Sequence, residues 1–253
     1  MKKQATHIPW IDDAAPLPPP ETAQKKGTEL AGLIAAGGGL SVNRLLEAYA
    51  QGIFPWFSKE QPVLWWSPDP RMVLKTDEFK LHRSLRKTLQ AFVAKPYCEI
   101  KIDFDFEQVI QQCAQTARKG QPSTWIVDEM IEAYKLLYAA GFAHSVETWV
   151  DGQQVGGLYC ICIGGAIFGE SMFSHQTDAS KIALCALVAI CRANQLPWID
   201  CQQNTRHLAS VGAKEISREI FLQNVREYVT QPAPKWEFNS TYWSKILPSK
   251  IAS

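Results

Sequence analysis

A single carboxylate interrupts a segment that otherwise reads as a buried strand. Glu170 lies in residues 167–173, whose other members are apolar or small. Strand alternation predicts Phe168, Glu170 and Met172 on one face, and burying an unpaired carboxylate costs roughly several kcal/mol. Glu170 is therefore an edge-strand charge, one half of an internal ion pair, or a carboxylate whose partner is a bound cation. We place the candidate active site around residues 169–173.

Two further polar residues follow the longest apolar stretch of the chain. Asp200 and Gln202 alternate within the expected strand 198–202, so they point to the same face. They lie near the carboxyl end of that strand, where the sites of α/β proteins gather. Turn hydrogen bonds at a strand end are the alternative explanation.

The motifs of covalent catalysis and of nucleotide binding are missing. Ser171 lacks a G-x-S-x-G elbow, Cys160 has no histidine nearby, and neither phosphate-binding glycine motif occurs. Residues 174–178, before the expected helix 179–193, contain no glycine, whereas acetyl-CoA enzymes of the GNAT type usually have a glycine-rich turn there. We therefore expect direct acyl transfer without a covalent enzyme intermediate, from a donor other than coenzyme A. An acetyl-CoA-dependent acetyltransferase is the rival interpretation.

A basic run and several tryptophans could bind a substrate. Helical spacing brings Arg83, Arg86 and Lys87 together on one surface, which is either a solvated helix face or a phosphate-binding site. The tryptophans at 56, 65, 66 and 125 either pack in the core or line an apolar pocket. Together these features would also suit a nucleic-acid-binding module without catalytic activity.

The hydrophobic pattern predicts an α+β fold with a mixed sheet. Strands are expected at 97–102, 143–150, 155–163, 166–173 and 198–202, and helices near 41–52, 80–89, 106–118, 128–140, 179–193 and 217–228. A meander followed by a crossover helix and a re-entering strand is typical of GNAT-like acyltransferases. We predict a small N-terminal domain (1–71), in which ordered structure begins at Ser41 after an irregular arm, and a GNAT-like domain (72–253).

Composition indicates a soluble cytoplasmic enzyme. The 253 residues carry 26 basic and 25 acidic side chains, so a nucleic acid would have to bind a local basic patch. Prolines interrupt the N-terminal region where a signal-peptide core would lie, and no apolar run is long enough to span a bilayer. The seven cysteines lack zinc-site spacing, and we expect reduced, mostly buried thiols.

Short segments between residues 40 and 220 match a known family in consecutive order. They are LLEAY (45–49), GIFPWF (52–57), WWSPDPR (65–71), HRS (82–84), TWI (124–126), HSVE (144–147), VGGLY (155–159), GESMFS (169–174), ASK (179–181), IDCQ (199–202) and ASVGA (209–213). In these segments the chain resembles the leucyl/phenylalanyl-tRNA-protein transferases. The resemblance implies transfer of Leu, Phe or less readily Met from aminoacyl-tRNA to proteins with N-terminal Arg or Lys, which marks them for degradation.

The same resemblance assigns roles to individual residues and implies no metal or nucleotide cofactor. Glu170 would face the basic side chain of the acceptor, and Asp200 and Gln202 would lie at the reacting ester and amine. The basic run would contact the tRNA backbone. An apolar pocket would hold the aminoacyl side chain, and its predicted members are Trp56, Trp125, Leu158, Ile167 and Phe168.

Overall fold

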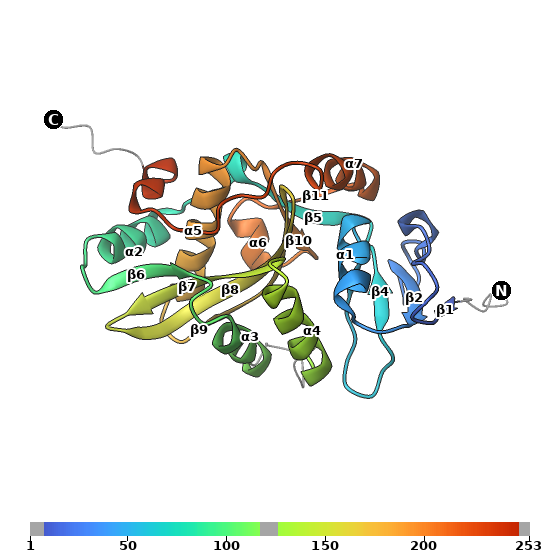
Figure 1. Ribbon diagram of the computed structural model, residues 1–253. Helices are drawn as coiled ribbons and strands as arrows, with labels where there is room; N and C mark the ends of the chain where they lie inside the picture. Colours follow the sequence, from blue (N-terminus) through green and yellow to red (C-terminus); the bar gives the residue numbers. More distant parts are fainter. Residues whose placement is uncertain (1–7, 117–125, 248–253) are drawn as a thin grey trace.

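The N-terminal part of the chain forms a small sheet of its own. The structure, a computed structural model, describes residues 8–116 and 126–247 (Figure 1). Four strands, β1 (Trp10–Ile11), β2 (Leu33–Gly37), β3 (Phe54–Pro55) and β4 (Leu64–Trp66), pair in the order β1-β2-β4-β3. The short η1 (Pro20–Thr22) and helix α1 (Val42–Ala50) complete this unit.

The prediction that ordered structure begins at Ser41 is wrong. All five residues of β2 are buried, and Ala35 has no exposed surface. A continuous apolar run suits a strand covered on both faces, a signal that the surrounding prolines and glycines obscured. The segment before it is also fixed, because the Arg44 guanidinium donates to the carbonyl oxygens of Asp12, Asp13 and Ala15.

The second sheet has seven strands in the order β11-β5-β10-β9-β8-β7-β6. Their bounds are β5 (Arg71–Lys75), β6 (Cys98–Ile102), β7 (Ala143–Val150), β8 (Gln153–Ile163), β9 (Ala166–Ser174), β10 (Trp198–Gln202) and β11 (Lys214–Ile216). Neighbours pair antiparallel except β9 and β10, which run parallel and are joined by the crossover helix α5 (Ala179–Ala193). The predicted α+β class with a mixed sheet is confirmed, as is the GNAT-like order of meander, crossover helix and returning strand.

Helices cover both faces of this sheet (Figure 1). On one face α5 packs with α2 (Arg83–Val93) and with η3 (Ser240–Lys245), and these elements share one apolar cluster. On the other face α1 packs with α3 (Phe106–Gln115), α4 (Asp128–Ala139) and α7 (Arg218–Tyr228) in a second apolar cluster. We call these the α5 face and the α4 face. The remaining short elements are η2 (Thr76–Glu78) and α6 (Arg206–Ser210).

Several turns and helix starts carry residues that favour the observed backbone. Asp151 and Gly152 both have positive φ in the β7–β8 turn, as a tight hairpin requires. Ser41 caps α1 by accepting from the backbone N–H of Arg44. Asp178 stands at the start of α5, but its carboxylate contacts Lys181 and Thr88 and makes no capping hydrogen bond. The helix expected at 80–89 begins at Arg83.

The two parts share a core. The apolar cluster of the α4 face includes residues of both sheets, although the small sheet ends at Trp66 and the large one begins at Arg71. The domain boundary at residue 71 stays a prediction.

All seven cysteines are free and five are buried. Within residues 8–116 and 126–247, no helix combines the length and the apolar character needed to cross a membrane.

Candidate active site

Glu170 occupies an irregularity in strand β9. Pairing with β8 shifts between Ser171, which lies opposite Tyr159, and Gly169, which lies opposite Cys160. The extra residue reverses the alternation beyond it. Phe168 therefore packs in the cluster of the α4 face, whereas Met172 packs against the cluster of the α5 face. The prediction that Phe168, Glu170 and Met172 share one face is wrong for Met172.

Three side chains lie within hydrogen-bonding distance of the Glu170 carboxyl group. Tyr49 Oη on α1 lies 2.8 Å from Oε1, and Gln202 Nε2 on β10 lies 2.8 Å from the same oxygen. Tyr134 Oη on α4 lies 3.3 Å from Oε2. The two tyrosine hydroxyl oxygens are 2.5 Å apart. Four elements that are distant in the sequence thus meet at one carboxyl group.

The surroundings of Glu170 oppose its ionisation. Burial raises its pKa to about 8, and the negative charge of Asp200 adds to this effect. The hydrogen bonds from Tyr49 and Tyr134 and the positive charge of Arg71 lower the pKa but do not outweigh burial. Within the described part of the chain, Glu170 forms no ion pair. A cation that reached this carboxyl group would stabilise its ionised form.

Gln202 is held in an unusual backbone conformation. Its φ is +60°, and β10 shifts register against β5 between Asp200 and Gln202, which leaves Cys201 as the extra residue. A left-handed conformation at a non-glycine residue costs about 1–3 kcal/mol. The backbone N–H of Gln202 donates to Asp200 Oδ1 at 2.9 Å, and its side-chain amide is fixed by Glu170. Such strain is typical of functional sites.

Asp200 is already paired within the protein. Arg71 donates from Nε to Oδ1 at 2.8 Å and from Nη2 to Oδ2 at 2.6 Å. The guanidinium lies between the rings of Phe54 and Phe221, at 4.7 and 4.4 Å from their centroids, and it also donates to the carbonyl oxygen of Gly52 at 3.2 Å. Arg71 therefore joins the N-terminal unit, β10 and α7 in one buried contact.

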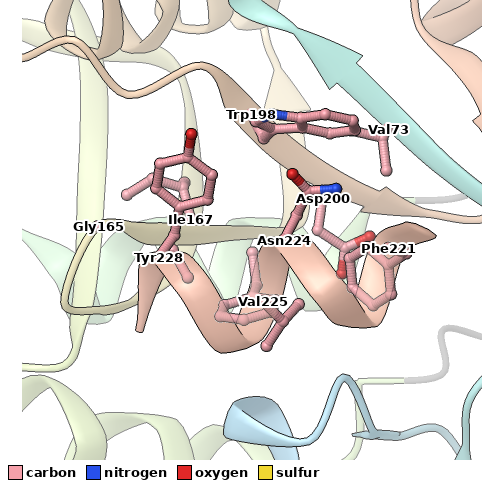
Figure 2. A pocket seen from close by; sticks show the side chains of 11 residues that line it. Val73, Gly165, Ile167, Trp198, Asp200, Phe221, Asn224, Val225 and Tyr228 are labelled. Atoms are coloured by element: carbon pink, nitrogen blue, oxygen red, sulfur yellow. The ribbon is translucent and has the colours of Figure 1, made fainter. Parts of the chain in front are cut away.

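A small cavity lies beside Asp200, between the sheet and α7 (Figure 2). Trp198 and Val73 line it from the sheet, and Asn224 and Tyr228 line it from α7. Its volume of ≈ 20 Å³ is close to the space that one water molecule needs. It is too small to hold an aminoacyl side chain.

Comparison with known proteins gives the family. A family model described as "Leucyl/phenylalanyl-tRNA protein transferase" matches residues 73–226, and a model of its N-terminal domain matches residues 38–69. A protein of Polaromonas sp. named "Leucyl/phenylalanyl-tRNA--protein transferase" is 57% identical and covers 99% of this chain and 98% of its own length. A protein of Albidiferax ferrireducens with the same name is 52% identical, and the match covers 100% of both chains. The chain belongs to the leucyl/phenylalanyl-tRNA protein transferase family.

The likeness to solved structures is weak by comparison. A GCN5-related N-acetyltransferase-like protein from Streptococcus suis is 14% identical, with a TM-score of 0.34 over 69% of this chain and 64% of that one. The fold assignment therefore rests on the strand order of this transferase itself.

The structure brings together the predicted catalytic residues of this transferase. Glu170 contacts Gln202, which in turn contacts Asp200. Their roles in the reaction stay predictions. Sequence reasoning missed Tyr134, which lies in the expected helix 128–140, and assigned no role in the site to Tyr49 or Arg71, although both stand in segments that match the family. The sequence held one signal for Arg71, which is a charged residue at the start of an otherwise largely apolar segment. That segment is the buried strand β5.

The described members of the predicted aminoacyl pocket lie in two different apolar clusters. Leu158 and Ile167 lie in the cluster of the α5 face, whereas Phe168 lies in that of the α4 face, against which Trp56 also packs. The physical reason is strand alternation, since neighbouring residues 167 and 168 point to opposite faces. Trp125 lies outside the described residues.

The predicted tRNA-binding residues are exposed and separate from Glu170. Arg83, Arg86 and Lys87 lie on α2, whose apolar side packs on the α5 face. Glu170, in contrast, contacts α1 and α4. Leu158 and Ile167 share the α5 face with α2. The predicted tRNA contacts and two of the predicted aminoacyl contacts, Leu158 and Ile167, thus lie on one face, and the predicted acceptor site lies on the other.

Proposed function

We propose that this transferase moves Leu, Phe and less readily Met from aminoacyl-tRNA to the α-amino group of proteins that begin with Arg or Lys. The product carries a signal for degradation, and the reaction takes place in the cytoplasm. The observation that carries the proposal is Glu170, a largely enclosed carboxyl group to which the described residues supply no ion-pair partner. The cationic side chain of the acceptor is that partner.

Gln202 orients the attacking amine. Its Nε2 donates to Glu170, so its amide oxygen is left to accept a hydrogen bond from the amine. An amide is not a base, and the α-amine has an ordinary pKa of about 7.7–8.0, so part of it is already neutral near neutral pH. Gln202 thereby holds the neutral amine beside both the recognition carboxylate and the ester.

The chemical step needs little beyond positioning. The amine nitrogen attacks the ester carbonyl, an amide bond forms, the ester C–O bond breaks, and the tRNA hydroxyl leaves with a proton. The ester is already activated, and holding the two reactants in place lowers the activation barrier by about 7–11 kcal/mol. Asp200 acts indirectly, because Arg71 occupies both of its oxygens and its Oδ1 also accepts from Gln202.

The leucyl or phenylalanyl side chain of the donor extends to the α5 face, while its ester lies beside Glu170 and Gln202, past the last paired residues of β9 and β10, Phe168 and Asp200. Leu158 and Ile167 contribute to the apolar site for the leucyl or phenylalanyl side chain, and Arg83 and Arg86 contact the tRNA backbone without reading its sequence. An apolar site separates side chains that differ by one methylene by only about 1–3 kcal/mol. Partial acceptance of Met follows from this limit.

The direct test supplies charged Phe-tRNA and three peptides that differ only in the first residue, Lys, Arg or Ala. We expect phenylalanine on the Lys and Arg peptides and little on the Ala peptide. Equal labelling of all three peptides would contradict the proposed preference for acceptors that begin with Lys or Arg. Binding of the tRNA without any peptide product would indicate a binding module, and activity with acetyl-CoA would indicate the acetyltransferase alternative.

A further inference from the structure

Two buried tyrosines lie against the Glu170 carboxyl group. Tyr49 on α1 and Tyr134 on α4 have no exposed surface. Their hydroxyls lie 2.8 Å from Oε1 and 3.3 Å from Oε2, and they also contact each other. Phenylalanine would fill nearly the same volume without a polar group in the core. The hydroxyls are therefore placed for the carboxyl group.

An ionised carboxylate suits this pair of hydroxyls. Each hydroxyl has one proton, so one proton links the two tyrosine oxygens and the other is donated to the carboxyl group. Hydrogen bonds to a charged acceptor are roughly twice as strong as neutral ones. Together with the hydrogen bond from Gln202 Nε2, the donated bond thus favours the charged form and fixes the orientation of the carboxylate.

We propose that Tyr49 and Tyr134 are positioning residues for acceptor recognition, which favour the charged form of the Glu170 carboxylate and hold it in one orientation for the cationic side chain of the acceptor. This inference rests on the proposed function of Glu170. Tyr49 belongs to the N-terminal unit, so this small unit contributes directly to the acceptor site.

The charges around Glu170 set the direction of the pH effect. Burial and Asp200 raise its pKa, to about 8, while the two tyrosine hydrogen bonds and Arg71 lower it. Removal of a tyrosine hydroxyl therefore raises the pKa further. A protonated carboxyl group does not pair with a cation, so the loss of acceptor affinity is largest at pH values below the pKa. The loss of acceptor affinity disappears at pH values at which Glu170 is ionised in both the wild type and the variant.

The test compares Tyr49→Phe with the wild-type protein, using a Lys-initiated peptide and saturating Phe-tRNA. KM and kcat are measured from pH 6.5 to pH 9.5, and the variant is divided by the wild type at each pH, so that titration of the peptide amine cancels. If the pKa of Glu170 rises by about one unit, the ionised fraction at the acidic end falls about tenfold, and we expect KM to rise by the same factor. The ratio falls towards one at the alkaline end, and kcat changes little. Tyr134→Phe gives the same pattern with a smaller rise, because its contact is longer.

Tyr138→Phe is the matched control. Tyr138 lies on the same helix as Tyr134, but its hydroxyl donates to the carbonyl oxygen of Asp103 at 3.0 Å. This variant keeps the wild-type KM at every pH. A KM that is unchanged in both Tyr49→Phe and Tyr134→Phe, or that rises equally at all pH values, overturns the inference. A wild-type protein that does not distinguish Lys from Ala peptides refutes the proposed function instead.

Discussion

Replacing Arg71 by Met would remove the cation that neutralises Asp200. The pair is almost fully buried, with side-chain exposures of 0% and 2%. Taking away one partner of a buried ion pair costs about 3–5 kcal/mol, because the other charge is left without compensation. In a protein of this size 1 kcal/mol shifts the melting temperature by about 2–4 °C. We therefore expect Arg71→Met to melt about 6–20 °C below the wild type.

A double variant separates the lost charge from the lost packing. Arg71→Met with Asp200→Asn has no buried charge at this place, and the asparagine oxygen still accepts from the backbone N–H of Gln202. Thermal melts followed by circular dichroism should show that the double variant recovers most of the stability lost in Arg71→Met. A single variant that melts like the wild type, or a double variant no more stable than the single one, would refute the reasoning.

Three further predictions concern Gly52, the basic surface of α2 and Glu170. Gly52→Ala destabilises by about 2–5 kcal/mol in urea denaturation, because φ is +70° and a Cβ would lie 2.6 Å from a methyl group of Leu222. Arg83→Ala with Arg86→Ala weakens tRNA binding and makes the negative slope of log affinity against log salt concentration shallower by about 2. Glu170→Gln stabilises the protein at pH 8.5 and not at pH 4, as judged by urea midpoints. The folded pKa of about 8 exceeds the ordinary value of 4.5, so the wild type loses stability as pH rises between these two values.

Each of these predictions has a control on the same chain. Gly141→Ala has a similar φ of +80° but no atom within 4 Å of the new Cβ, so it should cost less than Gly52→Ala. Lys25→Ala with Lys26→Ala removes two exposed charges of the N-terminal unit and should leave the salt slope unchanged. Glu129→Gln removes an exposed charge on α4 and should not reproduce the stabilisation at pH 8.5.

The elements that were predicted correctly are those with a local signal. Helix α5 contains an uninterrupted apolar stretch from Ile182 to Cys191, and the β7–β8 hairpin is marked by Asp151-Gly152 between two apolar runs. Both patterns depend on residues that are close in the sequence. The strand β11 and helix α6 have three and five residues, too few to show a periodicity.

The partners of the candidate site depend on contacts that no local pattern encodes. Tyr49 and Tyr134 are 85 positions apart, and Arg71 and Asp200 are 129 positions apart. Glu170, Asp200 and Gln202 could be selected because each is polar among apolar neighbours. Tyrosines are common in ordinary cores, so these two became candidates only when the fold placed their hydroxyls on a carboxyl group.

The aminoacyl pocket stays a prediction, although strand geometry places its described members in two apolar clusters. Ile167 and Phe168 were assigned to one apolar surface, although neighbours in a strand alternate. At Glu170 the error was the reverse one. Strand alternation was assumed there, although the extra residue in β9 interrupts it. An irregular pairing depends on the partner strand, and the sequence of β9 alone does not reveal it.

The central claim is that Glu170 recognises the charge of the acceptor's first residue. Arginine and citrulline have nearly the same shape but differ in charge, so the decisive measurement is kcat/KM for peptides that begin with each, in the wild type and in Glu170→Gln. A hydrogen bond to a charged group contributes about 1.5–3 kcal/mol, which corresponds to a preference of about 10- to 150-fold. We predict that the wild type prefers arginine by such a factor and that Glu170→Gln brings the ratio close to one. A ratio that stays the same in both proteins would contradict the assignment of Glu170.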